Sequence, residues 1–172
     1  MSEPMAVRLE IWPVSADTTG IWLVSGDDAW RPRLPVMADT EPHADVDLEL
    51  YSHGAADDVA LLHSTSWRVD GPAVVLTYMA VLRNPGVVLD RWPNARPISL
   101  PLVETVGKPP THSPIEPPAP RHIDALLHGL RHFRLLMAMD ATSAAALIEP
   151  WPTHLQPLQP ALAGLYSQVH AE

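Results

Sequence analysis

The clearest candidates for chemistry are an aspartate and two histidines spaced four residues apart, Asp124, His128 and His132. At this spacing, side chains lie one above another on a single helix face. Two such histidines can bind a metal ion, and the aspartate could complete the ligand set or orient an imidazole ring. A zinc protease would need His-Glu-x-x-His, but Gly129 stands at the glutamate position. The three residues are a candidate metal site, and the alternative is a polar helix face exposed to water.

A second group of possible metal ligands precedes Gly54. His43, Asp45, Asp47 and Glu49 alternate with apolar residues. On a strand they would line one face at intervals of about 7 Å, whereas on a helix they would spread around the axis. Only the strand arrangement makes a concentrated cation site, and the alternative is an exposed acidic element.

His63 is a third candidate, because it is followed by three hydroxyl residues, Ser64, Thr65 and Ser66. A serine nucleophile needs a strained turn of the G-x-S-x-G kind, which the chain lacks. We therefore expect a half-buried histidine that is hydrogen-bonded to the backbone. Glycine-rich nucleotide-binding motifs are also absent from the sequence. We assign no catalytic residue.

Composition limits the partners of the chain. Its 172 residues fit a single domain, 1–172, with its own core. The formal charge of −9 disfavours binding to nucleic acid or to anionic lipid. Without cysteine, any metal must be held by His, Asp or Glu. The sequence has no signal peptide and no long apolar run, so we expect no membrane association and a cytoplasmic location.

The hydrophobic pattern predicts four strands, near residues 6–14, 20–25, 58–68 and 73–83. Pro13 indicates an edge position or a strand end for the first strand, which would form a hairpin with the second. The last run is apolar on both faces, as in a strand inside a sheet, and its short connection to the third strand predicts antiparallel neighbours. In the third strand we expect five residues to share one face: Val59, Leu61, His63, Thr65 and Trp67.

Two main helices are predicted, near residues 40–53 and 120–138. In the first, polar residues alternate as in a strand, but Glu41-Pro42 and Gly54 are typical of the two ends of a helix, and we favour the helix. The second carries apolar residues at spacings of three and four and should pack on the sheet. The expected fold is therefore α+β, with a mixed or antiparallel sheet.

The remaining segments are less regular. A little strand is expected near 87–89 and a short helix near 99–106. Prolines make 107–120 an internal connector, and those from Pro150 to Pro160 indicate irregular or extended backbone. Short helices in 140–172 would close the domain, one in ATSAAALIEP and one in LQPALAGLYSQV.

The segments LYSHGAADDVALLHSTSW and RHIDALLHGLRHFRLL, together with the element order over residues 6–137, resemble the Nudix family. The first is similar to its helix, glycine and strand passage, and the second to its closing helix. The resemblance implies an α/β/α sandwich in which glutamate pairs ahead of the glycine bind the divalent ions that activate water against a phosphoanhydride. Here Tyr51 and Ser52 stand at the place of a glutamate pair, and no arginine precedes them. The scaffold is thus implied without the usual hydrolase activity.

Three functional hypotheses follow. The leading one is a non-catalytic Nudix-like module that binds a protein partner, a second copy of itself or a small molecule, with no cofactor. The six tryptophans bear on this hypothesis, because we expect most of them in the core but tryptophan is also favoured at interfaces. The second is a structural subunit of a larger assembly. The third is a metal-dependent hydrolase of phosphoanhydride-type substrates with an atypical site drawn from Asp45, Asp47, Glu49, His128 and His132.

Overall fold

The computed structural model describes residues 6–34, 36, 41–84, 86–99 and 122–162. Its five strands are β1 (Ala6–Asp17), β2 (Gly20–Leu23), β3 (Val59–Asp70), β4 (Ala73–Leu82) and β5 (Arg96–Pro97). They form one sheet in the order β3-β4-β1-β2-β5, in which β1 and β4 are parallel and the other neighbours antiparallel. The predicted α+β class with a mixed sheet is confirmed, as is the antiparallel pairing of β3 with β4.

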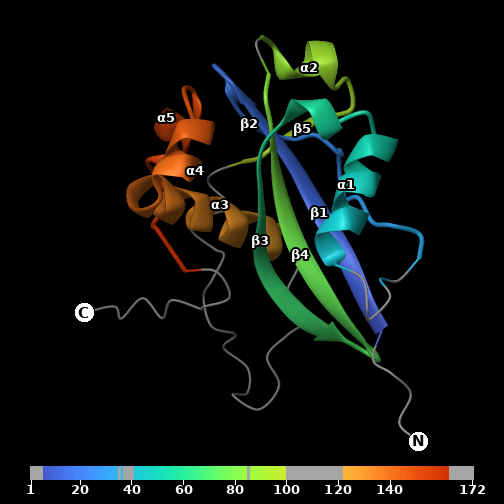
Figure 1. Cartoon of the computed structure of the whole chain (residues 1–172). Coiled ribbons are helices and arrows are strands. Elements are labelled where there is room, and N and C mark those ends of the chain that lie inside the picture. Colours follow the sequence, from blue (N-terminus) through green and yellow to red (C-terminus); the bar gives the residue numbers. More distant parts are fainter. Residues whose placement is uncertain (1–5, 35, 37–40, 85, 100–121, 163–172) are drawn as a thin grey trace, which may run out of the picture.

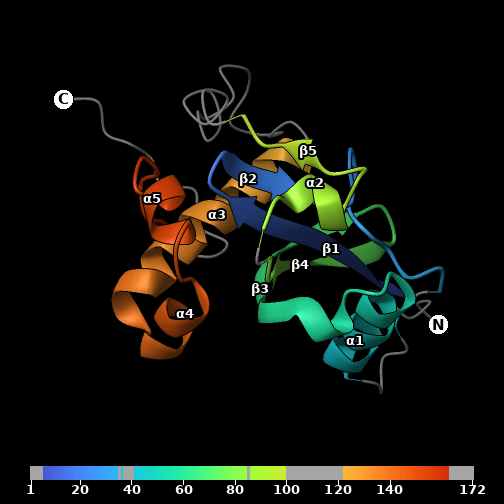
Figure 2. The same ribbon diagram turned by 90° about the horizontal axis from the view of Figure 1, so that it is seen from above.

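Helices cover both faces of this sheet. They are α1 (Pro42–Ser52), the 3-10 turn η1 (Ala56–Asp58), α2 (Val88–Arg91), α3 (His122–Met139), α4 (Ala141–Ala146) and α5 (Trp151–Leu155). Figures 1 and 2 show α1 on one side and α3 on the other, and we call these sides the α1 face and the α3 face. Because successive strand residues point to opposite faces, Ile11 joins the core under α1 while Trp12 joins the core under α3. In the described part of the chain, no helix is long and apolar enough to cross a membrane.

Pro13 lies inside the central strand β1, so the predicted edge position or strand end is wrong. Its carbonyl oxygen accepts a hydrogen bond from the Val24 amide at 2.9 Å, just past the end of β2. The proline nitrogen lies on the same side of β1, between the last pair of the β1–β2 ladder, Val14 with Leu23, and the isolated bridge of Ile11 with Trp30. The missing amide hydrogen therefore costs the ladder nothing at this position.

Helix α1 confirms the helical prediction for residues 40–53, and its end shows why the glycine matters. Gly54 has a left-handed φ of +67°. Its amide donates to the Tyr51 carbonyl, and the Ala55 amide donates to the Leu50 carbonyl, each at 2.9 Å. These two bonds make a Schellman motif, which glycine favours because it has no Cβ. Buried Leu50 and Ala55 then supply the apolar contact that accompanies the motif.

Helix α3 packs closely on β4 through Gly129. A Cβ atom at this position would lie 2.6 Å from both Cγ and Sδ of Met79, whose side chain is fully buried. The residue that excluded a zinc-protease motif therefore has a packing role. Its missing side chain lets the predicted apolar stripe of α3, including Leu130 and Phe133, reach the sheet.

Three segments differ from the predictions. The register of β3 shifts between Ser64 and Ser66, as in a β-bulge. Before the shift His63 lies opposite Met79 on the α3 face, and after it Trp67 lies opposite Leu76 on the α1 face. The prediction that the five residues from Val59 to Trp67 share one face is therefore wrong. The residues near 87–89 belong to α2 instead of a strand, because the Asp17 carboxylate accepts a hydrogen bond from the Val88 amide at 3.0 Å and holds the first turn of a helix.

In the C-terminal part, the helix predicted in ATSAAALIEP is present as α4. The stretch from Pro150 to Pro160 is predicted to be irregular or extended, but its first part forms α5, because Pro152 falls in the first turn, where its missing amide is tolerated. Residues 156–162 are not helical. The remaining predictions for 100–121 and 163–172 lie outside the described residues.

Candidate functional site

The most unusual polar group in the structure is the carboxylate of Glu10, in the middle of the sheet. Glu10 lies on β1 between Leu9 and Ile11, and its side chain points to the α3 face together with that of Trp12. It is fully buried, with 0% of its surface exposed. A buried carboxylate without partners would be strongly destabilising, so the fold must provide compensating positive charge.

Arg31 provides the first positive charge. The segment before it is fixed to β1 by two hydrogen bonds of 2.9 Å, from the Ile11 amide to the Trp30 carbonyl and from the Trp30 amide to the Ile11 carbonyl. Arg31 then places its Nη2 atom 2.6 Å from Oε1 of Glu10. Both terminal nitrogens of Arg31 also donate to the carboxylate of Asp28, at 2.6 and 3.0 Å.

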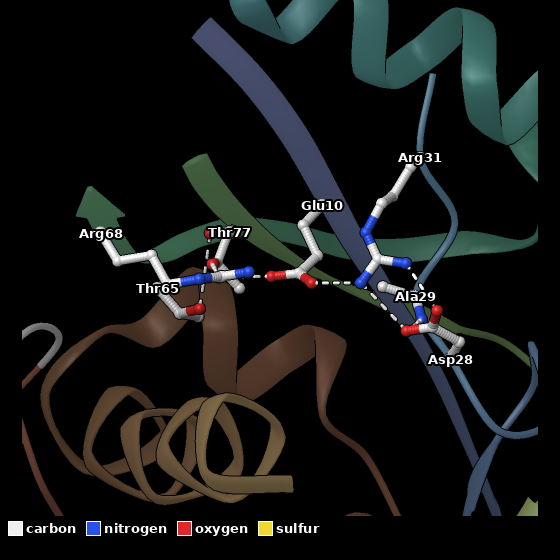
Figure 3. A network of polar contacts seen from close by, with 7 residues as sticks. All are labelled: Glu10, Asp28, Ala29, Arg31, Thr65, Arg68 and Thr77. Carbon is white, nitrogen blue, oxygen red and sulfur yellow. Dashed lines mark hydrogen bonds and ion pairs between the residues drawn. The ribbon is translucent and has the colours of Figure 1, made fainter. Parts of the chain in front are cut away.

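Arg68 provides the second positive charge from the opposite side. Arg68 opposes Val75 across β3 and β4, and Glu10 opposes Thr77 across β1 and β4, so the arginine must cross β4 diagonally to reach the carboxylate. Its Nη1 atom lies 2.6 Å from Oε2 of Glu10 and 3.5 Å from the Thr77 hydroxyl. Figure 3 shows the two guanidinium groups on either side of Glu10, one for each carboxylate oxygen.

The electrostatics agree with this geometry. Burial by itself would raise the pKa of Glu10, but the hydrogen bonds and positive charges of Arg68 and Arg31 outweigh burial and hold that pKa below its usual value. The hydrogen bond to Asp28 raises the pKa of Arg31, against the effect of its burial, and Glu10 adds to the rise. Glu10 therefore stays ionised at neutral pH between the two guanidinium groups.

Arg68 retains donors that the network does not use. Within the described residues, only its Nη1 atom makes a hydrogen bond, and the side chain is 25% exposed. The Nε and Nη2 atoms form the edge of a guanidinium that binds a carboxylate or phosphate through two parallel hydrogen bonds. Glu10 thus fixes the orientation of an arginine whose recognition edge is still available.

His63 and His132 form a second polar site, between β3 and α3. Their Nε2 atoms are 3.0 Å apart, and Nδ1 of His132 lies 3.2 Å from the Ala161 carbonyl oxygen. Because that carbonyl can only accept, Nδ1 of His132 carries the hydrogen, and its Nε2 accepts from His63. His63 is half-buried as expected, but its partner is a side chain and not the backbone. Both nitrogens of His132 are therefore engaged.

The predicted metal ligands do not assemble in the described ranges, where no three His, Asp or Glu side chains are grouped to hold an ion. Asp124 and His128 are both half-buried on α3, and both have partners. Burial, Arg131 and His132 lower the pKa of His128. Asp45, Asp47 and Glu49 lie on helix α1. Asp45 and Glu49 share a face there, four residues apart, but Asp47 points elsewhere, and Glu49 contacts His53 at 3.1 Å.

Sequence patterns did not identify Glu10, Arg31 or Arg68 as a site. The available signal was a carboxylate between the apolar residues Leu9 and Ile11 in the middle of one strand, both faces of which are covered. Its partners lie 21 and 58 residues further along the chain, so they meet Glu10 only through the backbone pairing of distant segments.

Comparisons with protein-family models, curated proteins and solved structures give no match to this chain.

Proposed function

We propose that this domain is a non-catalytic binding module for a small molecule that carries a phosphate or carboxylate group, and that Arg68 receives this group. One observation supports the proposal: a fully buried carboxylate positions an arginine whose Nε and Nη2 edge remains available. The positioning reduces the side-chain entropy that a ligand would otherwise have to overcome. Arg31 is less suitable, because Asp28 already binds both of its terminal nitrogens.

We also propose a Nudix-like scaffold that lacks the hydrolase function of the family. The element order, the helices on both faces of the sheet and the glycine at the end of α1 support this scaffold. Tyr51 and Ser52, at the place of a metal-binding glutamate pair, support the loss of hydrolysis. A cytoplasmic location remains part of the proposal.

The proposal is tested by thermal unfolding in the presence of nucleotides, nucleoside diphosphate derivatives, pyrophosphate and dicarboxylic acids. A ligand at one hundred times its dissociation constant adds about 2.7 kcal/mol to the free energy of unfolding. We expect at least one class to raise the unfolding midpoint by several degrees, with a smaller effect at high salt.

The decisive comparison uses Arg68→Lys, which keeps the charge but loses the planar edge, and Arg33→Gln, an exposed control. Arg68→Lys should abolish the ligand-induced shift, and Arg33→Gln should keep it. Equal shifts in both variants, or no shift with any of these compounds, would contradict the proposal. Release of phosphate from the binding compound in the presence of Mg²⁺ or Mn²⁺ would contradict its non-catalytic part and favour the metal-dependent hydrolase.

A further inference from the structure

The outer edge of β3 carries a regular, unpaired segment, Ser66–Asp70. In the part of the chain that the structure describes, β3 is the first strand of the sheet and pairs only with β4, and Figure 1 shows it along one border of the sheet. Its register shifts all lie before Ser66, so the last five residues form a continuous strand. Within the described residues, no backbone hydrogen bond reaches the outer edge of this segment. An unpaired, unbulged edge is a template for another strand.

The same segment exposes two large apolar side chains. Trp67 is 68% exposed and Val69 is 63% exposed, and both point to the α1 face. Neighbouring Val74 and Leu76 on β4 are only half-buried on that face. Apolar residues gathered along an open strand edge indicate a contact surface.

We infer that Ser66–Asp70 pairs antiparallel with the same segment of a second copy of this chain, about a two-fold axis at Arg68. In this register Trp67 lies opposite the partner subunit's Val69, and Val69 lies opposite the partner subunit's Trp67. Aromatic and β-branched residues are a favourable cross-strand pair, and the symmetry forms it twice. On the α3 face, Asp70 lies opposite the partner subunit's Ser66, whose hydroxyl group can donate to the carboxylate.

The charges of the segment agree with self-pairing. Two copies of Arg68 would oppose each other at the axis, and like charges directly opposite are destabilising. Here the guanidinium of each copy is turned inward across β4 and bound to Glu10, 2.6 Å away. Asp70 is also a diagonal neighbour of the partner subunit's Arg68, which gives opposite charges on the same face. The Glu10 network therefore removes the main obstacle to this register.

A second copy of the chain is a better partner for this segment than an unrelated strand. Each Trp67–Val69 pair needs one residue of each type on facing strands, and Ser66–Asp70 contains both. The interface is small, so we expect a reversible dimer whose population rises with concentration. Sedimentation equilibrium of the full chain over a range of concentrations should show this monomer–dimer equilibrium. A monomer at every concentration would overturn the inference, even if the edge then bound some other peptide.

The register is tested with Trp67→Lys and Val69→Glu. Each variant alone places a charge opposite an apolar residue at both symmetry-related positions, and we expect dimerisation at least tenfold weaker. Mixed in equal amounts, the two variants place the introduced lysine opposite the introduced glutamate and keep one Trp67–Val69 pair, so association should return. Leu48→Lys, at a residue on α1 that is 66% exposed, should dimerise like the original chain.

Circular dichroism checks that all three variants fold. Failure of the mixture to associate, or equal weakening by Leu48→Lys, would overturn the proposed pairing.

Discussion

Glu10 and Asp17 lie on the same strand, and each is a buried carboxylate, but different groups stabilise them. Glu10 is neutralised by two arginines from distant segments. Asp17 instead accepts hydrogen bonds from neutral groups: the Thr19 amide, the Thr19 hydroxyl and the Val88 amide. At the scale of single residues, burial alone therefore does not identify a binding site. Arg68 beside Glu10 leaves donors available, whereas the donors around Asp17 are used within the fold.

Asp17 gives a prediction at this scale. Burial would raise its pKa, but hydrogen bonds from Thr19 and Val88 lower that pKa from 3.8 to about 2. Because the folded pKa is the lower one, the stabilisation is complete above pH 3.8 and is lost as the pH falls toward 2. A difference of this size corresponds to about 2 kcal/mol. Asp17→Asn should lower the free energy of unfolding at pH 7 by about that amount.

Urea unfolding measured from pH 7 down to pH 2 checks this expectation, with the exposed Asp27→Asn as the control. The difference between Asp17→Asn and the unsubstituted chain should shrink as the pH drops below 3.8. A difference that stays constant over the whole range would mean that the carboxylate charge does not cause the stabilisation.

At the scale of elements, the fit between α3 and β4 depends on Gly129. Gly129→Ala raises intrinsic helix propensity by about 1 kcal/mol, but the new methyl group would overlap Met79, and overpacking a core costs about 1–3 kcal/mol. We expect net destabilisation by about 1 kcal/mol, measured by urea unfolding. In Gly86→Ala, where a Cβ would meet nothing within 4 Å, no overlap arises.

A double-mutant cycle separates overlap from a change in helix propensity. In a Met79→Ala background the methyl group has room, so Gly129→Ala should become neutral or stabilising. The same destabilisation in both backgrounds would show that contact with Met79 is not the cause.

The elements were largely predictable from local patterns, and the candidate site was not. Periodicity placed β1, β4 and α3, and Gly54 marked the end of α1, because each signal lies within a short stretch of chain. The position of Pro13 in a central strand depends on where β2 ends, and the bulge in β3 reverses the face of Trp67. These features arise from pairing between distant segments, as do the contacts of Arg31 and Arg68 with Glu10. A pattern of neighbouring residues contains no information on them.

At the scale of the whole molecule, histidines fasten the C-terminal segment to the rest of the domain. His154 donates from Nε2 to the Asp17 carbonyl at 2.7 Å, and His132 donates to the Ala161 carbonyl while accepting from His63. Two bonds involving Arg131 add to this attachment: its carbonyl accepts from the Ala161 amide, and its Nε donates to Gln159. Because one of these bonds comes from His132, the packing of residues 159–161 on α3 depends in part on the protonation of the His63–His132 pair.

This dependence predicts how stability changes with pH. Burial lowers the pKa of His63 from 6.5, the nearby His132 lowers it further, and Asp140 partly opposes both effects. Since the folded pKa is the lower one, the stabilisation is complete above pH 6.5 and is lost as the pH falls through the folded pKa. His63 donates from Nε2, so it takes up the extra proton on Nδ1 and then carries a positive charge against the buried His132 ring, which weakens the packing of that ring and of Ala161 beside it. Hydrogen exchange of the Ala161 amide should therefore accelerate in mildly acidic buffer, before global unfolding.

His63→Gln removes this titration, so its stability and the exchange of Ala161 should vary less between pH 7 and pH 5. His43→Gln, at an exposed histidine of α1, should behave like the unsubstituted chain, because His43 lies away from this pair. An acceleration that persists unchanged in His63→Gln would place the pH response elsewhere in the fold. The outcome thus decides whether the histidine pair, from two elements 69 residues apart in sequence, controls the docking of the C-terminal segment.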